Sequence, residues 1–260
     1  MSRFCVLNTE KSCISWAPIT FKDMFESTLR MDGDSWQVCN VAYGEQLPSD
    51  IKEFQGIIIT GSHYNCRDRD SLPWFEEVCE LIRHAANYGS PNFYGGCFGC
   101  QMIAHALGGE VDYNPQKQFA LKAEDIRLSP TFFKYLGSCQ DCELNTDTLN
   151  IIVSHGECVV KLPPGSELLA TSNSCAHEIF VTGEKKNIIC CQSHPEFLDV
   201  NYTIMERIAP IVIDQKKRLV GEQVVEAMNS FRKFDGNDAR KFLRAVSNFL
   251  HNHARASVMN

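Results

Sequence analysis

The chain has 260 residues, a formal net charge of −7 and a hydrophobic fraction of 44%, enough for one large core or one core with a modest appendage. Lys and Arg are scattered along it, which argues against a nucleic-acid partner and favours a small-molecule substrate. Its apolar runs are far shorter than the roughly 20 residues that a membrane span requires, so we expect no membrane association.

Thirteen cysteines are present, an odd number in a chain too long to need disulfide staples. This count favours free thiols in a reducing compartment, and we expect a cytoplasmic protein. Most of these cysteines sit in apolar or amphipathic segments and are expected to be buried. Cys97 alone stands out by its context.

Short β-rich runs alternate with helical segments in the first half of the chain. Strands are expected at residues 4–8, 36–41, 56–60 and 91–95, and helices at 19–31, 73–86 and 101–107. Such alternation predicts an α/β fold in which a mostly parallel sheet carries helices on both faces.

The second half is richer in strands and then becomes helical. Strands are expected at residues 123–128, 150–154, 168–172, 177–182 and 187–192, with an antiparallel edge, and helices at 200–217, 221–231 and 237–251. We therefore predict a catalytic domain over residues 1–200 and a C-terminal helical extension over 201–260 that packs on the same domain.

The segment around Cys97 predicts a nucleophile on a sharp turn. A strand ends near Gly95 and a helix follows so closely that almost no loop remains between them. Glycines at 95, 96 and 99 tolerate the crowded backbone of such a turn. A thiol there lies beside free N–H groups at a helix start, which stabilise a thiolate and an oxyanion.

Four motifs in chain order resemble those of class I glutamine amidotransferases. They are ITGS at residues 59–62, GGCFGCQ at 95–101, SHGE at 154–157 and QSHPE at 192–196. The resemblance covers about residues 1–200 and implies the flavodoxin-like fold of that family. Position 96 departs from it, with glycine in place of the usual aliphatic residue, and so does position 100, with cysteine. The helical tail makes the chain most similar to the plant γ-glutamyl peptidase branch.

This resemblance implies a Cys-His-Glu triad and no metal or cofactor. His194 and Glu196 flank Pro195, and an extended backbone would send both side chains to one side. In the implied site Cys97 is the nucleophile, His194 its base and Glu196 the orienting carboxylate. Gly61 and Phe98 donate to the oxyanion, and the candidates for substrate binding are Gln101, Ser154 and His155. The expected reaction is cleavage of γ-glutamyl amide bonds, in glutathione, its conjugates or other γ-glutamyl peptides, through a thioester.

Rival interpretations remain open. A glutaminase subunit could supply ammonia to a synthetase, which would be a separate protein because this chain has no phosphate-binding GxxxxGK[ST] loop. The pairs Cys97/Cys100 and Cys139/Cys142 have zinc-like or redox-like C-x-x-C spacing. Cys100 could also form a reversible regulatory disulfide with Cys97. A catalytically silent binding module is the remaining class, which activity in the purified protein would exclude.

Overall fold

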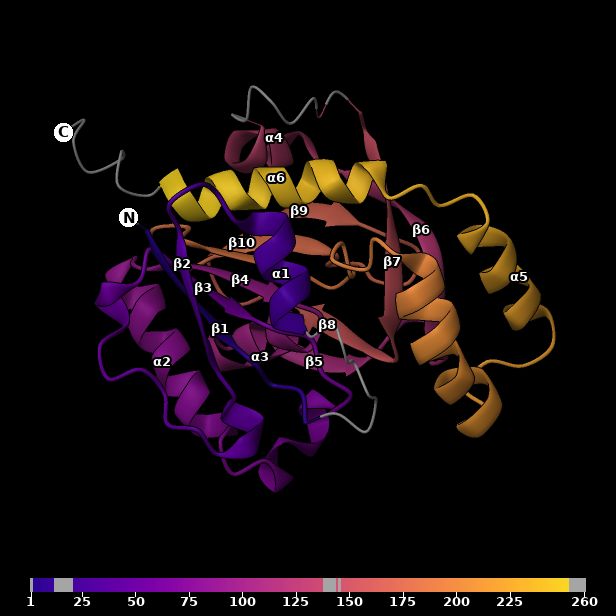
Figure 1. The fold of residues 1–260 in the computed structure, drawn as a ribbon, viewed down its shortest axis with the longest axis horizontal. Coiled ribbons are helices and arrows are strands. Elements are labelled where there is room, and N and C mark those ends of the chain that lie inside the picture. The colour runs from indigo at the N-terminus through magenta and orange to yellow at the C-terminus, as the bar shows by residue number, and fades with distance from the viewer. Residues whose placement is uncertain (1, 12–20, 138–143, 145, 253–260) are drawn as a thin grey trace.

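A nine-stranded sheet forms the centre of the molecule (Figure 1), with the order β2-β1-β3-β4-β11-β10-β9-β6-β7. The structure is a computed structural model that describes residues 2–11, 21–137, 144 and 146–252. Five neighbouring strands are parallel: β2 (Ser35–Cys39), β1 (Arg3–Leu7), β3 (Gly56–Ile59), β4 (Asn92–Gly96) and β11 (Ile188–Cys191). β1, β3, β4 and β11 are buried along nearly their whole length, as expected of strands covered by helices on both faces, whereas the edge strand β2 is exposed at Ser35 and Gln37.

The other half of the sheet is antiparallel. It consists of β10 (Ile179–Thr182), β9 (Glu167–Thr171), β6 (Ala120–Leu128) and β7 (Thr148–His155). Because direction reverses at each of these pairings, β7 again runs the same way as β11. The carboxyl ends of β3, β4, β11 and β7 therefore lie at one edge of the sheet, the edge at which α/β proteins bind ligands.

Helices cover both faces of the sheet and enclose two cores. On one face lie α2 (Phe75–Tyr88) and α3 (Phe98–Ala106); on the other lie α1 (Phe21–Leu29), α4 (Pro130–Leu136) and α6 (Asn237–Asn252) (Figure 1). Successive side chains of β1 point into opposite cores: Phe4 and Val6 pack in the core that contains α6, and Cys5 and Leu7 pack in the core that contains α2. The predicted α/β fold class is confirmed.

Three short elements escaped the sequence prediction. Strands β5 (Glu110–Tyr113) and β8 (Glu157–Lys161) form a separate antiparallel pair, and α4 lies in a stretch for which no element was predicted. β5 is mostly exposed and polar, so it has no apolar alternation to reveal it. β8 follows β7 after a single residue, Gly156, which left no visible boundary between the two.

The C-terminal part of the described chain is helical, as predicted. It begins with π-helical winding over Asn201–Ile208 and Pro210–Gln215 and continues through α5 (Glu222–Phe231) into α6. One face of α6, with Phe242, Ala245, Val246 and Leu250, is buried in the core that also holds Phe4. The domain boundary at residue 200 stays a prediction. Among the described residues, no helix combines the length and apolar character needed to cross a membrane.

Candidate active site

Cys97 occupies the turn between β4 and α3 in a strained backbone conformation. Its φ of 48° and ψ of −105° are unusual for a residue with a side chain, and such conformations cost on the order of 1–3 kcal/mol. The Cys97 N–H donates to the Cys191 carbonyl at 2.8 Å, which ties the turn to β11. Helix α3 begins at Phe98, three residues earlier than predicted, so Cys97 precedes it with no intervening loop.

Glycine at position 99 lets the turn lie against the sheet. A Cβ there would overlap the Ile59 carbonyl of β3. Position 95 is similarly crowded, since its Cβ would lie 2.9 Å from Gly99 backbone atoms. Gly96 is different because the nearest atom to its Cβ position is 3.5 Å away. The two crowded glycines hold α3 close to β3 and β4.

His194 and Glu196 form a buried pair after β11. The His194 Nδ1 atom lies 2.8 Å from Glu196 Oε1, and the imidazole ring stacks on Phe197 with centroids 4.3 Å apart. The pairing does not arise from the extended backbone that the sequence suggested: residues 194–197 form a turn, closed by the Phe197 N–H donating to the His194 carbonyl. The turn brings the carboxylate back under the ring.

The charge environment favours an imidazolium at position 194. Burial lowers the pKa of His194, but Cys97 and Glu196 outweigh burial and raise this pKa to about 10. An imidazolium beside a sulfur atom stabilises a thiolate. Gly61 completes the contact, since a Cβ at this glycine would lie 3.1 Å from His194 Cε1 and 3.5 Å from Cys97 Cβ. The predicted oxyanion loop thus touches both groups.

Gln101 acts within a chain of amides that reaches the nucleophile. Its Nε2 donates to the Glu157 carbonyl at 2.9 Å and to Gln192 Oε1 at 3.1 Å. Gln192 Nε2 in turn contacts Cys97 Sγ at 3.5 Å. We had not selected Gln192 as a site residue, although its place in the QSHPE motif is the signal that could have indicated it. Ser154 contributes its backbone, with its carbonyl oxygen 3.9 Å from Cys97 Sγ.

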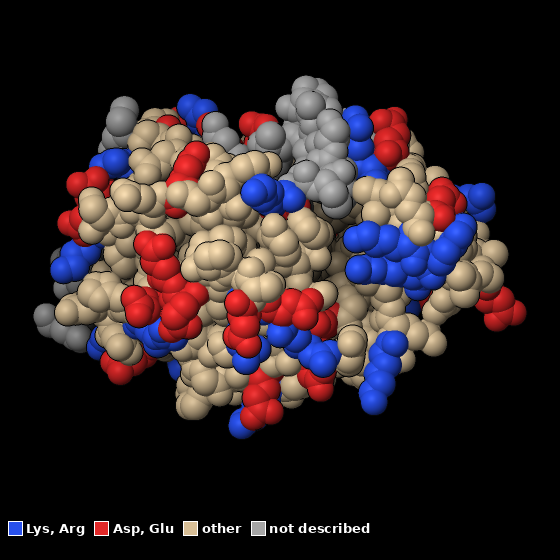
Figure 2. Space-filling view, turned by 90° about the horizontal axis from the view of Figure 1, so that it is seen from below, with Lys and Arg blue, Asp and Glu red and all other residues tan. Residues whose placement is uncertain are grey.

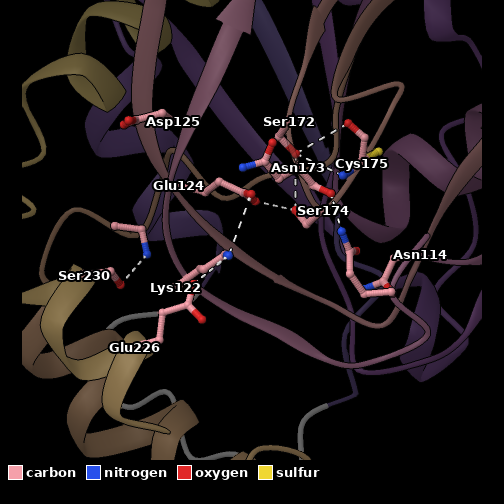
Figure 3. Close-up of polar contacts among 12 residues, drawn as sticks. Asn114, Lys122, Glu124, Asp125, Ser172, Asn173, Ser174, Cys175, Glu226 and Ser230 are labelled. Carbon is pink, nitrogen blue, oxygen red and sulfur yellow. Dashed lines mark hydrogen bonds and ion pairs between the residues drawn. The ribbon is translucent and has the colours of Figure 1, made fainter. Parts of the chain in front are cut away.

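His155 is a neutral buried imidazole, supported from behind by a hydroxyl. Burial, followed by the charge of His194, lowers its pKa to about 3. Its Nε2 lies 3.3 Å from Ser174 Oγ, and Ser174 donates to Glu124 on β6. Figure 3 shows Ser174 in contact with Glu124, and Lys122 between Glu124 and Glu226. His155 is therefore a buried residue of strand β7 and not a solvated loop histidine.

His63 pairs with a carboxylate that the sequence did not reveal. The His63 N–H donates to Glu10 Oε2 at 2.6 Å, and its Nδ1 lies 2.5 Å from Glu10 Oε1. Glu10 is only 6% exposed. It lies shortly after Leu7, the last residue of β1, and no local sequence pattern indicates its pairing with His63.

These groups line one cavity of about 660 Å³. Six of the eight predicted site residues line it: Cys97, Phe98, Gln101, Ser154, His155 and His194. Glu196 lies behind His194, and Gly61 contacts both Cys97 and His194. Part of the wall comes from the helical segment after residue 200, through Ile208, Ile211 and Val212. A cavity of this size is typical of small-molecule sites.

Within the described part of the chain, the structure gives no support to a metal or redox role for C-x-x-C. Across residues 2–11, 21–137, 144 and 146–252, no cluster of three or more His, Cys, Asp or Glu residues is placed to hold a metal ion. Cys139 and Cys142 lie outside the described residues. Cys100 is fully buried, and burial together with hydrogen bonding to Cys190 raises the pKa of its thiol well above the ordinary value. Such a thiol is a poor partner for disulfide exchange.

Comparison with known proteins identifies the family. The family model for glutamine amidotransferase class-I matches residues 21–201, so the chain belongs to the class I glutamine amidotransferases and is an enzyme of that family. A glutamine amidotransferase from Thermotoga maritima has the same fold, with a TM-score of 0.72 and 19% identity over 96% of this chain and 98% of its own. A second one, from Methylobacillus flagellatus, has a TM-score of 0.71 and 20% identity over 96% of this chain and 93% of its own.

Two relatives in sequence differ in how much of the chain they match. Gamma-glutamyl peptidase 3 of Arabidopsis thaliana is 29% identical over 236 residues, which cover 88% of this chain and 87% of the relative. A glutamine-hydrolysing GMP synthase of Bordetella avium is 30% identical over 166 residues, covering 59% of this chain and 29% of the relative. The chain is thus similar to the peptidases nearly end to end and to the synthase over one part. The predicted resemblance is confirmed.

Proposed function

We propose that this enzyme hydrolyses γ-glutamyl amide bonds in peptides such as glutathione and its conjugates, with Cys97 as nucleophile. The observation that carries the proposal is that Cys97 and His194 line the same cavity, with Glu196 paired to His194 from behind. The similarity to gamma-glutamyl peptidases over 88% of the chain supports the substrate class.

Acylation uses the imidazolium at position 194. The Cys97 thiolate attacks the γ-carbonyl carbon, and the electron pair of the C=O bond moves to oxygen. Backbone N–H groups of Gly61 and Phe98 stabilise this oxyanion, the second of them at the start of α3, where the N–H groups lack intrahelical acceptors. His194 then gives its proton to the leaving nitrogen as the C–N bond breaks. The products are a γ-glutamyl thioester and a free amine.

Deacylation reverses the role of the same imidazole. His194 is now neutral, so it accepts a proton from a water molecule that attacks the thioester carbonyl. The C–S bond breaks, releasing glutamate and returning the thiolate–imidazolium pair. Glu196 holds the Nδ1 side throughout and stabilises the cationic form of the ring.

The cavity favours a peptide leaving group over ammonia. Its wall continues beyond Cys97 to Ile208, Ile211 and Val212, which offers contacts to atoms beyond the γ-glutamyl unit. Binding energy from such remote atoms lowers the barrier when it is realised in the transition state. Glutamine has only an amide nitrogen on that side and gains nothing from this wall.

The second candidate is a glutaminase subunit that passes ammonia to a separate synthetase. The partial match to a glutamine-hydrolysing GMP synthase favours it. The two candidates differ in their need for a partner, since a peptidase is active alone. Under either candidate function we propose a cytoplasmic location. The free thiols at all described cysteines support a reducing compartment.

A substrate screen tests the proposal. Purified protein is assayed for glutamate release from glutathione, a glutathione conjugate, a simple γ-glutamyl amide and glutamine, each with and without cell extract from the source organism. We expect release from the γ-glutamyl peptides without extract. Release from glutamine alone, dependent on extract, would support the glutaminase subunit instead.

A further inference from the structure

Three cations that line the cavity have no carboxylate partner among the described residues. Lys117, Lys216 and Arg218 all line the cavity and are exposed. No ion pair within 4.0 Å joins any of them to an Asp or Glu of the described residues, whereas the cavity cation Arg67 pairs with Asp112. The chain carries a net charge of −7, so unpaired positive charge at a cavity is not a consequence of its composition.

The charges of the molecule are segregated on this face. Figure 2 shows Lys and Arg side chains gathered to the right of a hollow, and Asp and Glu side chains nearer the middle. The cavity itself is lined by carboxylates of Glu10, Asp68 and Glu157 as well as by the three cations. An anion entering the cavity would be drawn to these cations.

Lys117 is held in an uncommon conformation by a buried asparagine. Its φ is 52°, and its N–H donates to the Asn114 carbonyl at 2.9 Å. The Asn114 side chain donates to the Gln118 carbonyl at 2.6 Å, and the Asn114 N–H bonds the Gly156 carbonyl at 3.0 Å. The turn that carries Lys117 is therefore fastened directly to the loop after His155. Backbone strain of this kind accumulates at binding sites.

A second left-handed lysine positions the other two cations. Lys217 has a φ of 49° and lies just beyond the π-helical segment that ends at Gln215. On either side of it, the Lys216 N–H donates to the Ile211 carbonyl and the Arg218 N–H donates to the Val212 carbonyl, each at 2.8 Å. Lys216 and Arg218 line the cavity, and Lys217 between them does not. The Arg218 guanidinium also lies 5.0 Å from the Phe119 ring, a cation–π contact that restricts it.

These cations lie on the side to which a leaving group would extend. His194 protonates the leaving nitrogen in the proposed mechanism, so the released part of the substrate passes on the His194 side of Cys97. The His194 ring stacks on Phe197, which lines the cavity and shares one core cluster with Ile208 and Val212. Arg218 is hydrogen-bonded through its backbone to this same Val212.

We propose that Lys117, Lys216 and Arg218 form a subsite for a carboxylate of the leaving group, which selects γ-glutamyl amino acids and peptides with a free C-terminal carboxylate. This inference rests on the proposed function and specifies its substrate class. Arg218 is the main determinant, because a planar guanidinium binds a carboxylate through two parallel hydrogen bonds and Phe119 holds it in place.

The test compares one substrate with its neutral twin. kcat/KM is measured for γ-glutamyl-cysteinyl-glycine and for the same tripeptide with a C-terminal amide, using wild type, Arg218→Gln, Lys216→Gln and the control Lys217→Gln. We expect wild type to prefer the acid by about tenfold, roughly 1.4 kcal/mol. Arg218→Gln should bring this ratio close to one and Lys216→Gln should reduce it, whereas Lys217→Gln should retain it. Raising the salt concentration should also reduce the wild-type ratio.

Each contrary result has a distinct meaning. Equal kcat/KM for both tripeptides in wild type would overturn the subsite and leave the proposed function intact. A fall of equal size on both tripeptides in Arg218→Gln would mean that Arg218 serves the γ-glutamyl part or the fold, which also overturns the subsite. Cleavage of neither tripeptide by wild type would overturn the proposed function and the subsite together.

Discussion

Cys97 combines an accessible cavity position with a backbone conformation that few side-chain-bearing residues adopt. The strain is sustained by the hydrogen bond from its N–H to β11 and by the start of α3. Both supports are backbone groups, so they persist when the thiol is removed. The residue's side chain and its conformation therefore have separable roles.

Cys97→Ala should abolish turnover and leave the fold intact. The loss should be on the order of 10³-fold or more, because the thiolate makes the bond to the substrate. His194→Ala should cost nearly as much. Activity on glutathione and the thermal unfolding midpoint are measured on the same samples. Turnover by Cys97→Ala at the wild-type rate would refute the assignment of the nucleophile.

Glu196→Gln should lose less activity and change the pH profile. His194 must be protonated to release the leaving group, so kcat/KM should fall as pH rises through its folded pKa, which is about 10. Glu196 helps to raise this pKa, and removing its charge lowers it. The alkaline limb of kcat/KM against pH should therefore move to lower pH in Glu196→Gln. An unmoved limb would show that Glu196 does not stabilise the imidazolium.

Among the helices and strands, sequence patterns predicted those with a long, periodic arrangement of apolar residues. The helix that became α2 and the strand that became β3 were predicted because burial leaves a regular pattern of apolar residues in the sequence. β5, β8 and α4 were missed because their positions follow from tertiary contacts more than from local pattern. The start of α3 was placed too late because glycine argues against a helix locally, whereas Gly99 is required by the nearby Ile59 carbonyl.

The site was predictable in its motifs and not in its supports. Cys97, His194 and Glu196 stood in recognisable strings, and the structure brings them together. Glu10 and Ser174 act from segments with no sequence signal, because their partners, His63 and His155, are more than 18 residues away. Only the fold determines such pairings.

Packing of α3 against β3 predicts unequal effects of alanine at two glycines. Gly99→Ala would force a methyl group into the Ile59 carbonyl and should destabilise the protein by about 1–3 kcal/mol. Gly96→Ala is the matched control, since it meets nothing closer than 3.5 Å and should stay within about 0.5 kcal/mol of wild type. Denaturant unfolding measures both. Equal stabilities would contradict the close approach.

At the scale of the whole molecule, the helical C-terminal part belongs to the same core as the sheet. Phe242, Val246 and Leu250 of α6 share a cluster with Phe4 and Val6 of β1. The preceding segment supplies one wall of the cavity and two of its cations. The extension thus contributes to the core and to the lining of the cavity.

Removing residues 201–260 should prevent native folding. The truncation exposes the apolar side chains that α6 covers, and burial of each large one contributes about 1.5–3 kcal/mol. A total loss of this kind exceeds the stability of an ordinary domain. Circular dichroism and size-exclusion chromatography measure the outcome. A monomeric truncated chain with cooperative unfolding would show that residues 1–200 form an independent domain.

A comparison of two substrates tests whether the chain alone is a γ-glutamyl peptidase. kcat/KM is determined for γ-glutamyl-cysteinyl-glycine and for glutamine on purified protein without any partner, with Cys97→Ala as the blank. We predict that the tripeptide is preferred and that the blank is inactive on both. A preference for glutamine of about tenfold or more, or activity only after a cellular partner is added, would contradict the claim and support a glutaminase subunit.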